Sequence, residues 1–341
     1  MTMAGVAARA GVSISTVSHV LNRTRPVSPE LTERVRLAME ATGYSRNALA
    51  RSLATSTTRT VGIVMSATWN PFFAPVFSAI EETARQHGYT VLLADSHDDV
   101  ELEASQVRVM LDHQVAGVVL APAATAPTAV LDLLHDRRVP TTLVDRFADD
   151  RFNQVGTENV AATARLVTHL AELGHTRIGF VAGRAGLPTT AERLAGYRQS
   201  LRRAGLRFDR RLVGDGGSMA GTARAAVLRL LDGPKPPTAL VSGNNNMTLG
   251  VLRALREASV RVPDDLALVA YDDVQWADLI DPGLTAVRQP IAEIGRGAIA
   301  LLLGQIKDPG AAVRHHRLEP AFVHRGSCGC PASQGGDRAR H

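Results

Sequence analysis

The sequence of 341 residues lacks the features that mark secreted, membrane-spanning or disulfide-stabilised proteins. It has two cysteines, Cys328 and Cys330, and two thiols near one end of a chain cannot form a disulfide framework. Its longest apolar stretches, such as residues 298–304, are far shorter than the roughly 18 residues that a membrane helix needs. Arg9 interrupts the N-terminal apolar residues before the core of a signal peptide can form. We therefore expect a cytoplasmic protein with no membrane partner.

Several enzyme and metal signatures are also missing from the sequence. The two lysines, Lys235 and Lys307, do not follow a glycine-rich loop, so the chain has no Walker phosphate-binding motif. The pair His315-His316 and the two cysteines lack the spacing of metal ligands, and we expect them to be surface and tail residues. No general base is indicated beside a nucleophile. We predict no catalytic residues, no metal and no cofactor.

Positive charge is concentrated at one end of a chain that is otherwise typical of globular proteins. Hydrophobic residues make up 45% and charged residues 21%, and the length fits two or three domains. The net charge of +5 lies entirely within residues 1–60, and the remainder of the chain is electrically balanced. A small basic module on a neutral body indicates a polyanionic partner, although an ordinary solvated basic face explains the charge alone equally well.

Residues 1–44 predict three short helices. Apolar residues recur with helical spacing in three stretches that are bounded by capping residues. The first stretch ends at Gly11, Ser13 can cap the second, and the third begins at Pro29 and ends before Gly43. A tight glycine turn between the first two helices makes a helix-turn-helix.

In a helix-turn-helix the second helix lies in the major groove of DNA. Four of its positions point away from the predicted core: Ile14, Ser15, Ser18 and His19. An exposed β-branched residue such as Ile14 can contact a thymine methyl group, while Ser15 and His19 can hydrogen-bond to base edges. Other positions are better placed for phosphates: the amides near Ser13, and the side chains of Thr16 and Asn22.

The stretch from residue 10 to residue 22, AGVSISTVSHVLN, resembles the DNA-binding signature of the lactose-repressor/galactose-repressor (LacI/GalR) family of bacterial transcription regulators. The family usually has Arg at the position of His19 and an acidic residue at the position of Gly5. Loss of that Arg removes the side chain that most often reads guanine, so the DNA site is expected to differ. Loss of the acid removes part of a capping box and weakens the first helix.

The resemblance also implies a hinge helix in residues 45–59, which folds on DNA when two subunits pair. Leu53 matches the leucine that wedges into the minor groove, and Tyr44 and Asn47 would face phosphates. Arg46 stands where the family often has Pro. Without the preceding signature, a plain linker would be the simpler interpretation.

From Thr60 onward, short β-branched apolar runs alternate with helical stretches, which is typical of parallel α/β sheets covered on both faces. The predicted strands are 61–65, 91–94, 115–121, 141–144, 177–182, 239–242, 266–271 and 284–287. The predicted helices include 74–87, 102–113, 160–173, 192–204, 220–231 and 247–258. This length exceeds one sheet, so the predicted fold class is α/β with two doubly wound lobes after the helix-turn-helix head and hinge helix.

Ligands of such sheets bind outside the carboxyl ends of the strands, where this chain places its aromatic and polar loop residues. Both tryptophans, Trp69 and Trp276, fall in these loops although a core is the usual place for Trp. Aromatic faces beside Asp, Asn and Arg suit a small polyhydroxylated or planar ligand.

The same loops resemble the family's effector-binding body, which is similar to periplasmic sugar-binding proteins. The resemblance implies that Arg193, Asn244 and Asp272 bind polar groups of the ligand, and that the remaining contacts come from Phe72, Phe73, Asp145 and Arg146. Asn245 stands where the family commonly has Asp. Some residues have simpler explanations: Asp273 and Asn246 as helix caps, and Asp145 with Arg146 as a local ion pair.

The expected organisation is a DNA-binding domain (1–44), a hinge (45–59), a two-lobed body (60–326) and a disordered tail (327–341). The first lobe is expected at about 60–156 and 288–311, and the second at about 157–287 and 312–326. We expect a homodimeric repressor that binds a pseudo-palindromic DNA operator and responds to an effector, a sugar or alternatively a purine or nucleoside. No heptad tail follows Gly326, so a tetramer is not expected. The rival interpretations are a sugar-binding transport protein and a cytoplasmic α/β enzyme acting on a sugar.

Overall fold

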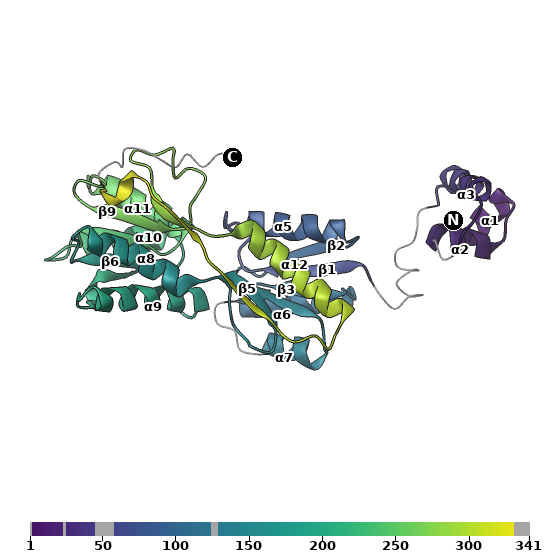
Figure 1. The fold of residues 1–341 in the computed structure, drawn as a ribbon, viewed down its shortest axis with the longest axis horizontal. Coiled ribbons are helices and arrows are strands. Elements are labelled where there is room, and N and C mark those ends of the chain that lie inside the picture. Colours follow the sequence, from purple (N-terminus) through teal and green to yellow (C-terminus); the bar gives the residue numbers. More distant parts are fainter. Residues whose placement is uncertain (1, 23–24, 45–57, 124–128, 331–341) are drawn as a thin grey trace. The chain divides into compact units, whose positions relative to one another are not determined.

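The structure is a computed structural model that describes residues 2–22, 25–44, 58–123 and 129–330. The chain forms two compact units, Met1–Thr58 and Arg59–His341, which we call the head and the body. The body contains two sheets, each with helices on both faces (Figure 1). The predicted fold class is confirmed.

The head consists of three helices around a small apolar core: α1 (Met3–Ala10), α2 (Ile14–Asn22) and α3 (Pro29–Thr42). Thr2 caps α1 by accepting a hydrogen bond from the Gly5 amide, and Gly11 ends that helix with a φ of 60°. Ser28 caps α3 by accepting from the Leu31 amide, with Pro29 at the first helical position. The buried core residues come from all three helices: Val6, Ala7, Ala10, Val17, Val35 and Ala38.

The first sheet has the strand order β11-β5-β4-β3-β1-β2, and its described strand pairs are parallel. Its strands are β1 (Thr60–Met65), β2 (Thr90–Asp95), β3 (Gly117–Leu120), β4 (Thr141–Val144), β5 (Asn153–Thr157) and β11 (His315–Leu318). Its helices are α5 (Phe73–Gln86), α6 (Val100–Asp112), α7 (Ala129–Asp136) and α12 (Ile291–Lys307). Alternate residues of β1 face opposite ways: Ile63 packs with α5 and α12, and Val64 with α6 and α7.

The second sheet has the order β12-β10-β9-β8-β6-β7, in which β12 runs antiparallel to β10. Its strands are β6 (Ile178–Ala182), β7 (Val213–Asp215), β8 (Ala239–Ser242), β9 (Ala267–Tyr271), β10 (Thr285–Arg288) and β12 (Ala321–Val323). Helices α8 (Asn159–Glu172) and α9 (Pro188–Arg203) cover one face, and α10 (Ala220–Leu231) and α11 (Asn245–Glu257) cover the other. Short 3₁₀ turns lie at Arg210–Leu212 and Gly326–Cys328.

The chain crosses between the lobes three times: after β5, after β10 and after β11 (Figure 1). The first two crossings lie close to the expected positions. The third differs, because we assigned residues from about 312 onward to the second lobe, whereas His315–Leu318 pairs with β5 in the first sheet. The chain returns to the second lobe only at Ala321, where β12 begins.

The prediction that a disordered tail begins at residue 327 is wrong for the first residues of that range. Residues 326–328 form a 3₁₀ turn in which Ser327 and Cys328 are buried. The Ser327 hydroxyl donates to the Leu268 carbonyl at 2.6 Å and accepts from the Thr285 amide at 2.8 Å. These bonds fasten the turn to β9 and β10, so Cys328 belongs to the second lobe's core and not to a tail. Residues 331–341 lie outside the described part of the chain.

Candidate functional site

The start of α2 carries a cluster of hydroxyl groups beside an exposed apolar side chain. Ser13 Oγ accepts a hydrogen bond from the Thr16 amide at 3.0 Å and lies 2.7 Å from Ser15 Oγ and 2.8 Å from Thr16 Oγ1. Ile14 is 52% exposed, as its placement away from the core predicts. A helix N-terminus that carries exposed hydroxyl groups and one exposed apolar side chain matches the surface that a recognition helix presents to DNA.

The head's core fixes the orientation of this surface. Val17, on the opposite side of α2, is fully buried against α1 and α3. Arg34 of α3 donates to the Ala10 carbonyl at 2.6 Å and so holds the turn between α1 and α2. Ser18 and His19 are half-buried. Tyr44 is half-buried against the head's core, which leaves only part of its side chain for the predicted phosphate contact.

Three predicted DNA contacts lie outside what the structure describes: the side chain of Asn22, and the hinge residues Asn47 and Leu53. The hinge helix therefore stays a prediction.

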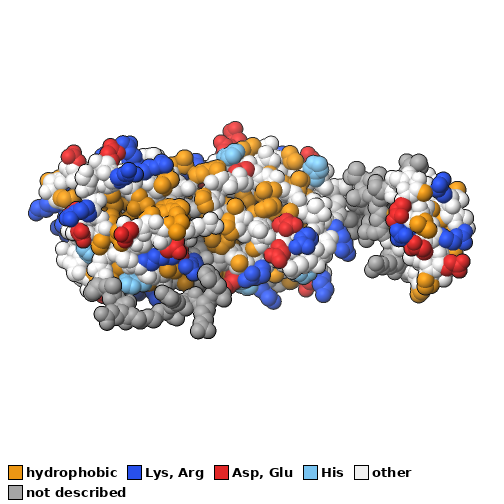
Figure 2. Space-filling model, turned by 90° about the horizontal axis from the view of Figure 1, so that it is seen from above, with side chains coloured by type: hydrophobic (Ala, Val, Ile, Leu, Met, Phe, Trp, Pro, Cys, Tyr) orange, Lys and Arg blue, Asp and Glu red, His pale blue; other side chains and the backbone are white. Residues whose placement is uncertain are grey.

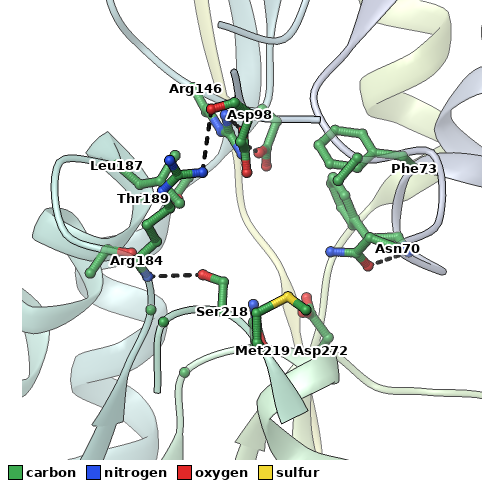
Figure 3. A pocket seen from close by; sticks show the side chains of 18 of the residues that line it. Asn70, Phe73, Asp98, Arg146, Arg184, Leu187, Thr189, Ser218, Met219 and Asp272 are labelled. Carbon is green, nitrogen blue, oxygen red and sulfur yellow. Dashed lines mark hydrogen bonds and ion pairs between the residues drawn. The ribbon is translucent and has the colours of Figure 1, made fainter. Parts of the chain in front are cut away.

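A cavity of about 530 Å³ lies between the two lobes of the body, at the carboxyl ends of their strands. Figure 3 shows Arg146 and Asp98 of the first lobe across this space from Ser218 and Asp272 of the second. Seven of the eight predicted effector-binding residues line it: Phe72, Phe73, Asp145, Arg146, Arg193, Asn244 and Asp272.

Trp276 does not line the cavity. Its ring is partly buried and packs against the core of the second lobe, among side chains beneath α10 and α11. Trp69, which we did not select, lines the cavity and is 51% exposed. Both tryptophans follow a strand, but only the loop after β1 turns its tryptophan toward the other lobe. The prediction that Trp276 binds the effector is therefore not supported by its position, because Trp276 packs against the core as tryptophan usually does.

Two aspartates hold equivalent positions in the two lobes. Asp145 follows β4 with a φ of 69°, and Asp272 follows β9 with a φ of 78°. Aspartate tolerates this left-handed conformation better than most residues, although it costs free energy. The conformation places each carboxylate at the cavity wall directly beyond the last residue of a buried strand.

Arg146 is a buried cation held by groups of the first lobe. Its Nη1 donates to Asp98 at 2.6 Å and also bonds to the Pro122 carbonyl. Its Nε lies 3.6 Å from the Asp145 carboxylate, too long for a hydrogen bond, and is buried with no hydrogen-bond partner. An Nε–H without a partner costs free energy, which a ligand's oxygen can recover. The ion pair that we proposed as a simpler explanation exists, but it leaves bonding capacity at the cavity.

Arg193 is a buried cation held by the second lobe. Its Nε donates to Asn159 at 2.9 Å and its Nη1 to the Gly243 carbonyl at 2.7 Å. The guanidinium carbon lies 3.7 Å from the centre of the Tyr271 ring, a close cation–π contact. These contacts fix a planar donor fork, which is the geometry that binds vicinal oxygens or a carboxylate.

Burial raises the pKa of two carboxyl groups that interact with Arg146. Burial raises the pKa of Asp145 to about 6, although the nearby Arg146 and Arg193 lower it. Burial likewise raises the pKa of Glu103 to about 7, against a hydrogen bond from the Ala123 amide at 2.6 Å. The sequence does not single out Glu103, because this residue stands in an ordinary helical pattern. Asp145 lines the cavity, and a carboxyl group with a perturbed pKa at a cavity is typical of functional sites.

The second lobe's polar wall also bridges the lobes. Asp272 accepts from the Asn245 amide at 2.9 Å and from Gln289 Nε2 at 2.5 Å. Asn245 Nδ2 then donates to Asn70 of the first lobe at 2.7 Å. Asn244 accepts from the Met247 amide at 2.8 Å, so it caps α11 as well as lining the cavity. Asp273 is not a cap; it pairs with Arg288 and Arg325.

A helix-turn-helix head and a two-lobed body with a polar cleft define a DNA-binding regulator with a small-molecule site. Residues 2–47 match the model of bacterial regulatory proteins of the lacI family, and residues 167–328 match that of the periplasmic binding protein-like domain. The chain belongs to the lacI family, and this membership decides against the enzyme and transport alternatives.

Curated relatives and solved structures cover almost the whole chain. The ribose operon repressor of Escherichia coli K12 is 33% identical over 96% of this chain and 99% of its own length. The repressor PurR of Vibrio atlanticus is 31% identical over 95% and 97%. Among solved structures, the lac repressor dimer bound to operator and the anti-inducer ONPF is 27% identical with a TM-score of 0.86. The transcriptional regulator CelR–cellobiose complex is 30% identical with a TM-score of 0.73. Each of these two matches covers 96% of this chain and 99% of the other chain.

None of the described helices is both long and apolar enough to cross a membrane.

Proposed function

We propose that this regulator is a cytoplasmic repressor that binds a pseudo-palindromic operator as a homodimer and is controlled by a sugar in the inter-lobe cleft. The observation that carries the proposal is the paired wall of the cleft. Each lobe contributes one aspartate in a left-handed conformation and one buried arginine: Asp145 and Arg146, and Asp272 and Arg193. Carboxylates accept and guanidinium groups donate hydrogen bonds, which together suit the hydroxyl groups of a sugar.

The relatives support an effector of this size and polarity. One is named for the ribose operon, and one solved neighbour is a complex with cellobiose. Phe72 and Phe73 meet edge to face with ring centres 5.1 Å apart and supply an apolar side to the cleft. A sugar presents apolar C–H faces together with hydroxyl edges, so both kinds of wall are used. PurR relatives make purines the second class to test.

The surface of the body supports pairing with a second copy. β2 is an edge strand of the first sheet, and its Leu93 is 40% exposed. Leu249 of α11 is 39% exposed and Leu279 is 81% exposed. Figure 2 shows apolar side chains gathered over one face of the body. An uncovered strand edge and an exposed apolar surface are both features that a second copy of the chain can cover. Sedimentation at the mass of the monomer or tetramer would contradict the predicted homodimer.

DNA binding is tested by the salt dependence of operator affinity. Operators are first selected from a random duplex pool, and the affinity is then measured over a range of salt concentrations. The log–log slope should be about −0.9 per phosphate neutralised. The substitution Ile14→Ala should weaken the selected site more than random DNA, because Ile14 is expected to read bases. A flat salt response would contradict the proposal.

The effector is tested by tryptophan fluorescence during titration with monosaccharides, disaccharides, sugar phosphates and purines. Trp69 lines the cleft and Trp276 does not, so a saturable change should survive Trp276→Phe and disappear in Trp69→Phe. The change should also disappear in Asp272→Asn. Asp273→Asn is the matched control, because that neighbouring carboxylate does not line the cavity. A response that survives Asp272→Asn and Arg193→Ala would place the ligand elsewhere.

A further inference from the structure

Four potential metal ligands converge at the end of the second lobe: His169, His324, Cys328 and Cys330. Their ligating atoms all lie within 4.8 Å of one another. Cys328 Sγ lies 3.3 Å from His324 Nε2, and Cys330 Sγ lies 3.5 Å from His169 Nε2. Both thiols are free, and none of the four residues lines the inter-lobe cavity. We predicted no metal site because the two cysteines and the His315-His316 pair lack metal-ligand spacing. The fold instead brings the cysteines to His324 and to His169, which lies about 150 residues earlier in the chain.

The distances fit a tetrahedral centre. Zn–S bonds of about 2.3 Å and Zn–N bonds of about 2.0–2.1 Å give ligand-to-ligand edges of about 3.3–3.8 Å. The two measured sulfur–nitrogen distances fall within this range. The ligating atoms are all within 4.8 Å of one another, so the longest separation exceeds the expected edge by at most about one ångström. Side-chain rotation can supply a movement of this size. Two thiolates with two imidazoles are the donor set of structural zinc sites.

The surrounding fold holds the ligands in place. His169 lies in the last turn of α8 and packs edge to face against Phe322 of β12, with ring centres 5.2 Å apart. Cys328 is fully buried in the core of the second lobe. Gly329 has a φ of 80°, and this left-handed residue reverses the chain between the two cysteines. A residue with a Cβ would be strained there, so glycine lets both thiols face the histidines.

The segment between His324 and Cys328 is also anchored. Arg325 donates to Asp273 at 2.7 Å and to the Leu284 carbonyl at 2.7 Å, and Ser327 bonds to β9 and β10 as described above. His324 is exposed, which provides a path for an ion. The ligand positions are thus set by the fold before any ion binds.

We propose that His169, His324, Cys328 and Cys330 form a Zn²⁺ site. The ion replaces the thiol protons and joins the end of α8 to the segment that follows β12. Its role is structural, because four protein ligands leave no open position for a substrate. It fastens the last strand of the second lobe, directly after the third crossing between lobes. This inference does not depend on the proposed effector or operator.

The test uses the full-length chain, purified under reducing conditions without chelator, with zinc measured by elemental analysis. We expect one zinc per chain. Cobalt(II) loaded in its place should give thiolate-to-cobalt charge-transfer bands and the d–d spectrum of tetrahedral coordination. Free zinc at about 100 times its Kd should raise the Tm of the body by roughly 5–10 °C relative to the metal-free protein.

The variants separate a metal site from simple packing of thiols and imidazoles. Cys328→Ser can destabilise the core because Cys328 is fully buried, so Cys330→Ser and His324→Ala are tested beside it. All three should lose the zinc and the cobalt charge-transfer bands or weaken them greatly, whereas His113→Ala, at an exposed histidine of the first lobe, should keep both. A metal-free protein with no cobalt–thiolate bands overturns the proposal. So does a Cys328–Cys330 disulfide that forms in the cell and prevents metal binding.

Discussion

Replacement of Asp145 by Asn should stabilise the body at neutral pH and leave its stability at acid pH nearly unchanged. Burial raises the pKa of Asp145 to about 6, whereas an aspartate in an unfolded chain titrates near 3.9. Between these values the folded protein binds more protons than the unfolded protein, so the free energy of unfolding falls as the pH rises through this window. Above pH 6 the full cost of the buried charge is present.

The magnitude follows from the size of the shift. About two pKa units at 1.36 kcal/mol each correspond to about 3 kcal/mol at pH 7. Asparagine has the same shape without the charge, and it tolerates the φ of 69° as well as aspartate does. Asp145→Asn should therefore raise the free energy of unfolding by up to about 3 kcal/mol at pH 7.5, and by close to zero near pH 4.

The assay is urea denaturation of both proteins across this pH range, followed by circular dichroism and tryptophan fluorescence. The wild-type profile alone is ambiguous, because the pKa of Glu103 is also raised, to about 7. The difference between variant and wild type isolates Asp145. A variant that is equally stable or less stable at pH 7.5 would refute the reasoning, since it would mean that Arg146 and Arg193 stabilise the carboxylate by more than its burial costs.

Three further predictions concern packing, capping and the contact between the lobes. Gly196→Ala should destabilise the body by about 1–3 kcal/mol in urea denaturation, because a Cβ would lie 2.2 Å from the Val160 carbonyl between α8 and α9. Gly221→Ala is the control: a Cβ there has nothing of the described chain within 4 Å, so the change should be neutral or stabilising by up to about 1 kcal/mol. Equal effects of the two substitutions would contradict this prediction. Ser28→Ala removes the cap of α3 and should lower the head's stability by about 1 kcal/mol, seen as faster amide exchange in α3 but not in the body. Asn245→Ala removes the hydrogen bond to Asn70 and should increase the radius of gyration of the body in small-angle scattering. Asn246→Ala should not change it, because Asn246 Nδ2 has no hydrogen-bond partner among the described residues. An unchanged radius in both variants would show that the bond between Asn245 and Asn70 does not hold the lobes together.

The sequence predicts best where apolar periodicity decides the structure. Each of the eight predicted strands corresponds to an observed strand, and the capping residues locate the three helices of the head. β5 was missed because it is buried through polar residues: Asn153 bonds to Gln305 and to the Arg314 amide, and Gln154 to the Ala148 amide. Buried polar side chains that are satisfied by distant partners produce no apolar run, so pattern alone does not reveal such a strand.

The candidate sites also include parts that the sequence predicts and parts that it does not. The cleft could be predicted because parallel strands bring their carboxyl ends together, so residues that follow different strands must meet. Glu103 and the cysteine–histidine cluster could not be predicted. Each depends on contacts between segments that are distant in the sequence and that no motif or spacing links. Trp276 shows the limit of loop position as a guide, since side-chain direction depends on local packing.

The place of α12 in the chain has a consequence for synthesis. This helix supplies Ile294, Ala298, Ile299 and Leu302 to the core of the first lobe, yet it is made after nearly all of the second lobe. At bacterial elongation rates the first lobe leaves the ribosome and waits on the order of ten seconds for this helix, with one apolar face uncovered. The head, whose three helices are contiguous, is complete from the outset. A nascent chain of this regulator thus carries a finished DNA-binding module well before it has a finished sensor, and protection of the uncovered face during that interval is a requirement built into the topology.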